Sequence, residues 1–162
     1  MCLSNNNRNN YVSEVPIRPH HGMCLAYFIG KGYSEGFSAH MEHMLHVFQN
    51  NIPVRLVIHT DEICSACPNN DNNLCSSSDK VTLYDKEVLE QCGLSEGMKM
   101  DFFEFAGIIQ KKIIDSGMRE QICGDCQWNE ICSEHQSRWE TLEISIGKRD
   151  NKWHTICIEY LI

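Results

Sequence analysis

Two cysteine triplets constrain this chain more than any other feature of its sequence. Each triplet begins with a Cys-x-x-Cys motif, and a third cysteine follows from the same loop. They are the first triplet, Cys64, Cys67 and Cys75, and the second triplet, Cys123, Cys126 and Cys132. A tight Cys-x-x-Cys turn presents two thiolates to one metal or cluster, and its backbone N–H groups can hydrogen-bond cluster sulfurs. The triplets therefore predict metal-binding loops that have no apolar anchors of their own.

The surrounding composition favours ligands over disulfides. Ten cysteines in 162 residues is far more than an ordinary cytosolic enzyme contains. The N-terminal MCLSNNNRNN has no apolar signal-peptide core, and no apolar run is long enough to span a membrane. We therefore expect a cytoplasmic protein, and disulfides seldom persist in that reducing compartment. The net charge of −8 and the absence of a basic stripe predict no nucleic-acid partner, and we expect no membrane partner.

The identity of the metal follows less directly. Zinc prefers four closed tetrahedral ligands, which Cys64, Cys67, Cys123 and Cys126 can supply across a long connection. That site leaves the third cysteine of each triplet unexplained. A Cys-x-x-Cys motif with further cysteines is common for 4Fe-4S clusters, so we predict one or two such clusters, with zinc as the alternative. Burial of the cysteines as small apolar residues is disfavoured because both motifs lie in loops.

Each triplet lacks a fourth ligand, and Cys24 is the best candidate to supply one. It follows a histidine pair and lies one turn inside the first predicted helix. His135 is an alternative, since it trails Cys132 by three residues, whereas Cys92 ends an apolar stripe and is expected in the core. Cys2 and Cys157 are interpreted as incidental. If Cys24 completes one triplet, the other can keep an open iron.

Four segments together resemble a known prokaryotic family. They are IRPHHGMC (residues 17–24), GKGYS (30–34), DEICSACPN (61–69) and CGDCQW (123–128). The chain is similar over about residues 15–135 to the uncharacterised family catalogued as domain of unknown function 1284, whose members are often labelled iron–sulfur binding. The resemblance implies cluster binding by both triplets and Cys24. It implies no known reaction, and the stretch after His135 falls outside it.

Arg18, His20 and His21 are candidate catalytic residues beside the predicted cluster. Arginine can bind an anionic substrate, and a neutral histidine can donate or accept a proton. The alternative is structural, with Arg18 in a salt bridge and the histidines capping or packing. Trp128 is expected to shield the cluster from water. Asp61 and Glu62 are interpreted as solvated.

We expect an α+β fold: a mainly helical single domain over residues 15–162, after an Asn-rich disordered tail at 1–14. Apolar periodicity and capping residues predict helices at about 20–29, 34–50, 78–92 and 101–115, followed by a further helical turn at 116–122. A β-branched run predicts a short strand at 53–59, and alternation around a Gly-Lys-Arg-Asp-Asn turn predicts a C-terminal hairpin at 138–162.

The sequence as a whole predicts a cytoplasmic iron–sulfur protein used for redox or sulfur chemistry. Two mechanisms are open. With every iron ligated by protein, the molecule relays electrons to a redox partner protein. With one iron open, it is an enzyme that binds a small-molecule substrate, oriented by Arg18, His20 or His21. The alternative from another class is a zinc-binding structural or protein-interaction module without catalysis.

Overall fold

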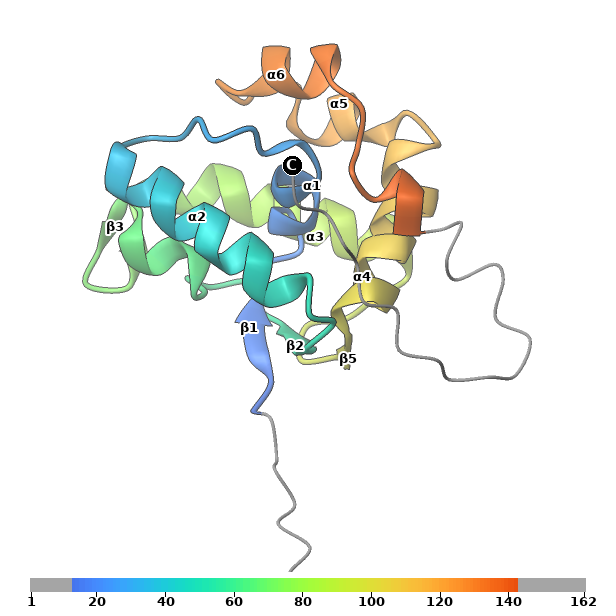
Figure 1. Ribbon diagram of the computed structural model, residues 1–162, viewed down its shortest axis with the longest axis horizontal. Helices are drawn as coiled ribbons and strands as arrows, with labels where there is room; N and C mark the ends of the chain where they lie inside the picture. Colours follow the sequence, from blue (N-terminus) through green and yellow to red (C-terminus); the bar gives the residue numbers. More distant parts are fainter. Residues whose placement is uncertain (1–12, 143–162) are drawn as a thin grey trace, which may run out of the picture.

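A small three-stranded sheet lies at one end of the fold (Figure 1). The computed structural model describes residues 13–142. The strands are β1 (Val15–Ile17), β2 (Pro53–Leu56) and β5 (Lys99–Asp101), in the order β1-β2-β5. β1 pairs parallel with β2, with Ile17 opposite Leu56, and β5 runs antiparallel to β2. Ile17, Val54 and Leu56 are fully buried, so β1 brings the chain through the core directly before the first helix.

All but the last of the helices form where apolar spacing and capping residues predict them, and the mainly helical α+β fold is confirmed. They are α1 (His21–Tyr27), α2 (Glu35–Phe48), α3 (Ser78–Cys92), α4 (Phe102–Ile109), α5 (Met118–Cys123) and α6 (Asn129–Glu134). A 3-10 turn spans Ile63–Ala66, and a π-helical turn over Gln110–Ile114 continues α4. The Ser34 hydroxyl caps α2 by accepting the Phe37 N–H at 3.1 Å. Gly93, with φ of 67°, ends α3 in the left-handed conformation.

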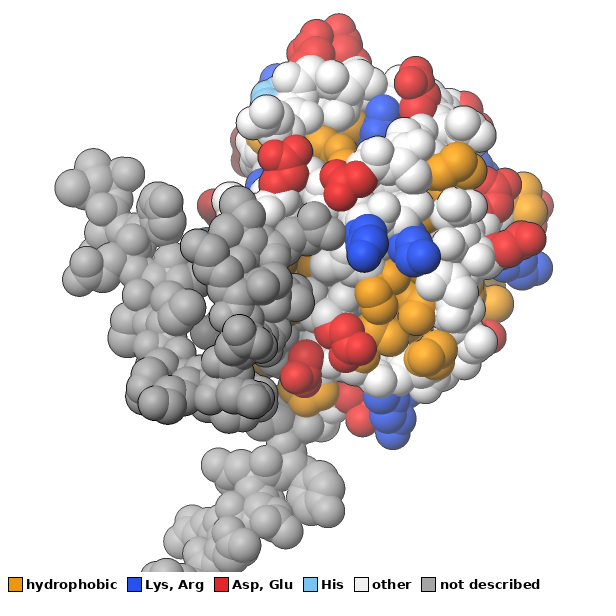
Figure 2. Space-filling model, turned by 90° about the vertical axis from the view of Figure 1, so that its right-hand side faces the viewer, with side chains coloured by type: hydrophobic (Ala, Val, Ile, Leu, Met, Phe, Trp, Pro, Cys, Tyr) orange, Lys and Arg blue, Asp and Glu red, His pale blue; other side chains and the backbone are white. Residues whose placement is uncertain are grey.

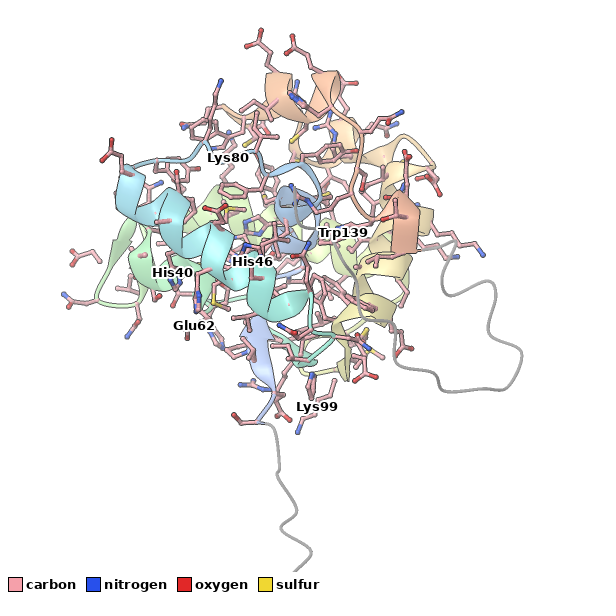
Figure 3. The ribbon with its side chains drawn as sticks, in the orientation of Figure 1. His40, His46, Glu62, Lys80, Lys99 and Trp139 are labelled. Atoms are coloured by element: carbon pink, nitrogen blue, oxygen red, sulfur yellow. The ribbon has the colours of Figure 1, made fainter. Side chains whose placement is uncertain are left out.

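Close packing against α4 fixes the position of α1, which carries Cys24. A Cβ on Gly22 would lie 2.8 Å from the Phe105 ring, so a glycine is needed for the two helices to approach. The segment after α6 returns to α1 as well. Its Trp139 is 2% exposed and donates its Nε1–H to the Gly22 carbonyl at 2.8 Å (Figure 3). Residues beyond the family resemblance are therefore part of the core.

A second contact joins α2 to the loop of the first triplet. His40, on α2, bonds through Nε2 to the Glu62 carbonyl oxygen at 2.8 Å (Figure 3). Phe48 of the same helix stacks on Phe102 of α4 with ring centroids 4.7 Å apart. The loop that begins the first triplet is thus tied to a helix that is itself packed in the core. α5 and α6 lie at the end of the body away from the sheet (Figure 1).

Some features differ from the sequence predictions. β1, β5 and α6 were not predicted, and neither was the hairpin of β3 (Asn70–Asp71) and β4 (Leu74–Cys75). Most of the predicted tail (1–12) and most of the predicted C-terminal hairpin (143–162) lie outside the described residues. The start of that hairpin, residues 139–142, forms a turn and a few helical residues. Within 13–142, no helix has the length and apolar character to span a membrane.

Charged side chains of both signs share the surface. On the face shown in Figure 2, basic side chains are interspersed with acidic ones and form no extended stripe. Lys99, for example, pairs with Glu14 at 2.8 Å beside β5. This mixture agrees with the acidic net charge of the whole chain, −8.

Candidate metal centre

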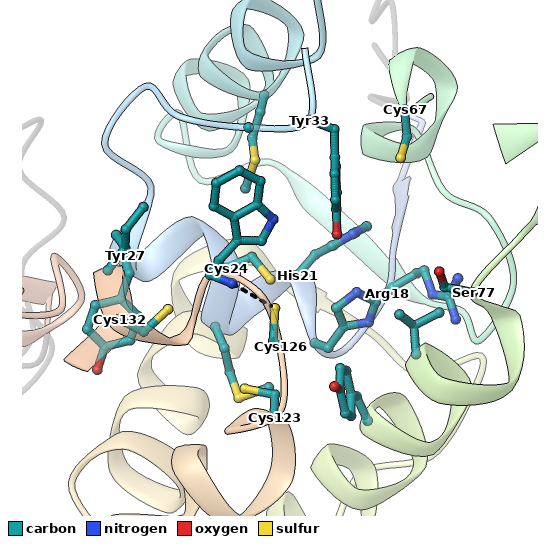
Figure 4. Close-up of a pocket in the computed structure, with 18 of the residues that line it drawn as sticks. Arg18, His21, Cys24, Tyr27, Tyr33, Cys67, Ser77, Cys123, Cys126 and Cys132 are labelled. Atoms are coloured by element: carbon teal, nitrogen blue, oxygen red, sulfur yellow. Dashed lines mark hydrogen bonds between the residues drawn. The ribbon is translucent and has the colours of Figure 1, made fainter. Parts of the chain in front are cut away.

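Seven cysteines from separate parts of the chain line one cavity of about 150 Å³. They are Cys24 together with all members of the first and second triplets. Apolar and aromatic side chains such as Met23, Met41 and Tyr33 line it too, together with polar and charged side chains that include Lys31 and Arg119. Every cysteine that the sequence singled out as a ligand therefore lies on the same cavity, part of which is shown in Figure 4.

The two Cys-x-x-Cys motifs fold into the same backbone turn. The N–H of Cys67 donates to the Cys64 carbonyl at 3.0 Å, and the N–H of Cys126 donates to the Cys123 carbonyl, also at 3.0 Å. Gly124 is required in the second turn because a Cβ there would overlap the Glu120 carbonyl oxygen. The absence of a side chain at Gly124 therefore relieves crowding within this turn.

A different backbone structure in each triplet brings the third cysteine back toward the Cys-x-x-Cys turn. In the first triplet, the β3–β4 hairpin pairs Asn70 with Cys75 and brings that thiol back toward Cys67. Burial raises the pKa of the Cys67 thiol, and the nearby Cys75 raises it further. In the second triplet, one helical turn returns the chain, with the Cys132 N–H donating to the Trp128 carbonyl at 3.3 Å. The polar loop around Asn70 thus has backbone pairing of its own.

Cys24 lies with the second triplet and not with the first. In Figure 4 its sulfur lies beside those of Cys123, Cys126 and Cys132, whereas Cys67 lies on the opposite side of the cavity. Burial raises the pKa of Cys24 well above its usual range, and the other three thiols raise it further. We call these four cysteines the four-thiol group. The sequence left open which triplet Cys24 completes, and the tertiary structure favours the second.

The other candidate ligands lie elsewhere. Cys92 is buried in the core, as predicted, and burial raises its pKa to about 11. His135 is exposed, does not line the cavity, and bonds through Nδ1 to the Ile131 carbonyl at 2.8 Å. Cys2 and Cys157 lie outside the described residues. The cysteines described within 13–142 all carry free thiols.

Arg18 and His20 meet on one buried carboxylate, that of Asp85. Two guanidinium nitrogens of Arg18 lie 2.7 Å from Oδ2, and Nδ1 of His20 lies 2.6 Å from Oδ1. Burial acts to raise the pKa of Asp85, but His20 and Arg18 hold it below its usual value. Burial and the adjacent His21 lower the pKa of His20. Arg18 therefore forms the salt bridge that the sequence analysis gave as its structural alternative.

Asp61 is a second buried carboxylate, so its interpretation as solvated was wrong. It is 7% exposed, and its Oδ2 lies 2.6 Å from Nδ1 of His21 and accepts the Arg18 N–H at 2.7 Å. Its Oδ1 accepts the Cys64 N–H at 3.1 Å. Although burial opposes ionisation, His21 holds the pKa of Asp61 well below its usual range. Arg18 and His21 lie about 40 residues from Asp61 in sequence, beyond the reach of local patterns.

Asp85 was missed altogether, although the sequence carries a signal for it. It follows Tyr84 on the inward face of α3, which also carries Val88 and Leu89. A charged residue at an inward position of an amphipathic helix is rarely buried without a partner. That position alone indicates a buried ion pair, but not with which residue.

Aromatic side chains cover the four-thiol group. Trp128 and Tyr33 both line the cavity, with ring centroids 5.5 Å apart in an edge-to-face arrangement. The Trp128 N–H donates to Cys126 Sγ at 3.5 Å, which is the dashed bond in Figure 4. An N–H directed at a sulfur stabilises its thiolate form. Trp128 therefore lies beside the four-thiol group, and its role as a shield of a cluster stays a prediction.

Comparison with known proteins gives a family but no function. The model of the family described as Protein of unknown function (DUF1284) matches residues 32–132, which include α2 and all members of both triplets. The segment 17–24, with Arg18, both cavity histidines and Cys24, precedes the matched range. No curated protein and no solved structure matches the chain.

Proposed function

The chain belongs to the DUF1284 family of proteins of unknown function, and we propose that it is a cytoplasmic iron–sulfur protein used for redox or sulfur chemistry. The observation that carries this proposal is the convergence of seven thiols, distant in sequence, on one cavity. Packing cysteines in this way has no advantage for an apolar core, since other small side chains would fill the same space without their reactivity.

The electrostatics of the thiols support a multivalent cationic partner. Burial raises the pKa of Cys123 to about 11, and burial also raises the pKa of Cys24 and Cys132. A thiolate at any one of these cysteines disfavours a second thiolate beside it, so the group does not ionise by itself at neutral pH. A bound metal or cluster removes that penalty because it compensates the thiolate charges, and binding then releases protons.

The spacing of the donors favours a cluster over a single zinc ion. Four thiolates on one zinc, at Zn–S distances of about 2.3 Å, lie roughly 4 Å from one another. Within residues 13–142, the one trio of potential ligands with donor atoms inside 4.8 Å is His21, Asp61 and Cys64, which contains a single thiol. No three thiols of the four-thiol group therefore lie within 4.8 Å of one another. Such spacing suits a cubane, whose four thiolates bind four different irons.

The two donor sets suggest different uses. The four-thiol group can ligate every iron of one cluster, which suits one-electron transfer to a redox partner protein. The first triplet offers three thiolates for a second cluster, which leaves a position for another protein ligand or for a small-molecule substrate. The free thiols also support a reducing, cytoplasmic location.

Metal analysis of the anaerobically purified protein tests the proposal. We expect a brown protein with broad absorbance near about 400 nm and iron and acid-labile sulfide in equal amounts. Two filled sites would give about eight irons per chain, and one filled site about four. A colourless protein with stoichiometric zinc would instead support the zinc-binding structural module.

A further inference from the structure

The first triplet has an imidazole where a fourth ligand is needed. His21 lines the same cavity as Cys64, Cys67 and Cys75, although it belongs to α1, which lies far from these cysteines in the sequence. A ring nitrogen of His21, a carboxylate oxygen of Asp61 and Cys64 Sγ lie within 4.8 Å of one another. The second triplet has Cys24 in the corresponding role, so the two donor sets differ in chemistry.

The hydrogen bond to Asp61 fixes which nitrogen of His21 is free. Nδ1 lies 2.6 Å from Asp61 Oδ2, and an ionised carboxylate can only accept, so Nδ1 carries the proton. In a neutral ring the lone pair is then on Nε2, and Nε2 has no hydrogen-bond partner among the described residues. Histidines that bind metals commonly donate their other N–H to a carboxylate in this way.

We infer that His21 is the fourth protein ligand of the centre held by the first triplet, binding through Nε2 with Asp61 orienting its ring. This inference rests on the proposed function. Asp61 itself is an unsuitable ligand because its oxygens already accept from Arg18, Cys64 and His21. A first-triplet centre completed by His21 has no open iron, so the assignment favours the electron carrier over the enzyme.

His20 is the matched comparison. It also lines the cavity, and its Nδ1 also lies 2.6 Å from a buried carboxylate, that of Asp85. Its ring belongs to no trio of close donors among residues 13–142, and it lies beside Tyr84 of α3 at a centroid distance of 6.2 Å. Substituting His20 therefore removes a similar imidazole from the same cavity without removing the inferred ligand.

A second consequence concerns the reduction potentials. Imidazole is neutral where a cysteine ligand is a thiolate, and histidine ligation raises the potential of an iron–sulfur centre. The first-triplet centre is then the more easily reduced of the two. Replacing His21 by cysteine would preserve a four-ligand set while shifting that potential to more negative values.

Pulsed EPR on the reduced protein tests the assignment. We would prepare wild type, His21→Ala, His21→Cys and His20→Gln anaerobically, each with and without ¹⁵N-histidine, and measure iron, sulfide and potentials. Wild type and His20→Gln should show a strongly coupled histidine nitrogen on one of two clusters. His21→Ala should lose that coupling and about half of its iron. His21→Cys should retain the iron, lose the coupling and shift one potential negative.

The outcomes separate this inference from the function on which it rests. A protein without iron or sulfide contradicts the proposed function itself. A protein with iron–sulfur clusters but no histidine coupling overturns only the His21 assignment. The same holds if the coupling survives in His21→Ala or disappears in His20→Gln. A single cluster, retained in full by His21→Ala, also overturns it.

Discussion

Asn70 and Asn129 occupy the same place in the two cysteine motifs. Each lies three residues after the second cysteine of a Cys-x-x-Cys turn and donates its backbone N–H to that cysteine's carbonyl at 3.0 Å. Their side chains then differ, since Asn70 Nδ2 donates to the Cys64 carbonyl at 3.0 Å and Asn129 Oδ1 accepts from Arg119 at 2.8 Å. The chain thus forms the same local turn twice, and the asparagine side chain of each turn makes a different hydrogen bond.

The shared turn predicts unequal tolerance at its second position. Gly124 and Ser65 occupy that position, and only Gly124 has a carbonyl where a Cβ would lie. Gly124→Ala should lower the free energy of unfolding of the metal-free protein by about 1–3 kcal/mol, as overpacking does, and reduce iron retention. Ser65→Ala, which removes an exposed hydroxyl, is the control. Urea unfolding and iron analysis measure both effects, and equal behaviour of the two variants would contradict the prediction.

Cys24 is partly buried and Cys92 is buried, but only Cys24 lies on the cavity. Cys24→Ser should remove a ligand of the four-thiol group and lower the iron content by up to about half, because one of two clusters loses its fourth thiolate. Cys92→Ser changes the same atom in the core and should leave iron and sulfide unchanged. Unaltered iron in Cys24→Ser would exclude it as a ligand.

Asp85 should make a large contribution to stability. Asp85→Asn leaves the Arg18 guanidinium buried without its counter-charge, and breaking a buried pair costs about 3–5 kcal/mol. The exposed pair of Lys99 and Glu14 provides the control, since surface salt bridges contribute about 0–1 kcal/mol. Denaturant unfolding of metal-free Asp85→Asn and Lys99→Gln at neutral pH compares the two, and similar losses would count against this interpretation of the network.

The same carboxylate should also make stability depend on pH. The pKa of Asp85 is lower in the folded protein, where His20 and Arg18 face it, than in the unfolded chain. The folded state therefore binds fewer protons than the unfolded state as pH falls below about 4, the unfolded pKa. The stabilisation is complete above that pH and is lost as pH falls toward the folded pKa. Unfolding free energies of the metal-free protein, measured against pH, should fall less steeply in Asp85→Asn than in wild type.

Trp139 should stabilise the fold through packing and through one hydrogen bond. Trp139→Phe removes the Nε1 donor and leaves the buried Gly22 carbonyl without it, at a cost of about 1–3 kcal/mol. Trp139→Ala also removes the contact with Phe102 and should cost about 3–5 kcal/mol. Thermal unfolding distinguishes these values. If both variants unfold at the wild-type temperature, the segment after α6 does not pack onto α1 in solution.

Much of this fold follows from local sequence. Ser34 begins α2 and Gly93 ends α3 at the predicted helix bounds, because capping depends on a few neighbouring backbone groups. The Cys-x-x-Cys turns are local in the same sense, and so is the crowding at Gly124. β1, β5 and the β3–β4 hairpin were missed because strands of two or three residues carry too little alternation to be recognised.

The sequence by itself determined the two Cys-x-x-Cys turns, because that spacing acts within a single turn, and from them it predicts a metal centre. Only the tertiary structure decided that Cys24 joins the second triplet, and that Asp61 and Asp85 are buried against His21 and His20. These carboxylate–histidine pairs join residues 40 and 65 positions apart. Their formation depends on how β1, α1 and α3 pack together, and no local pattern encodes that packing.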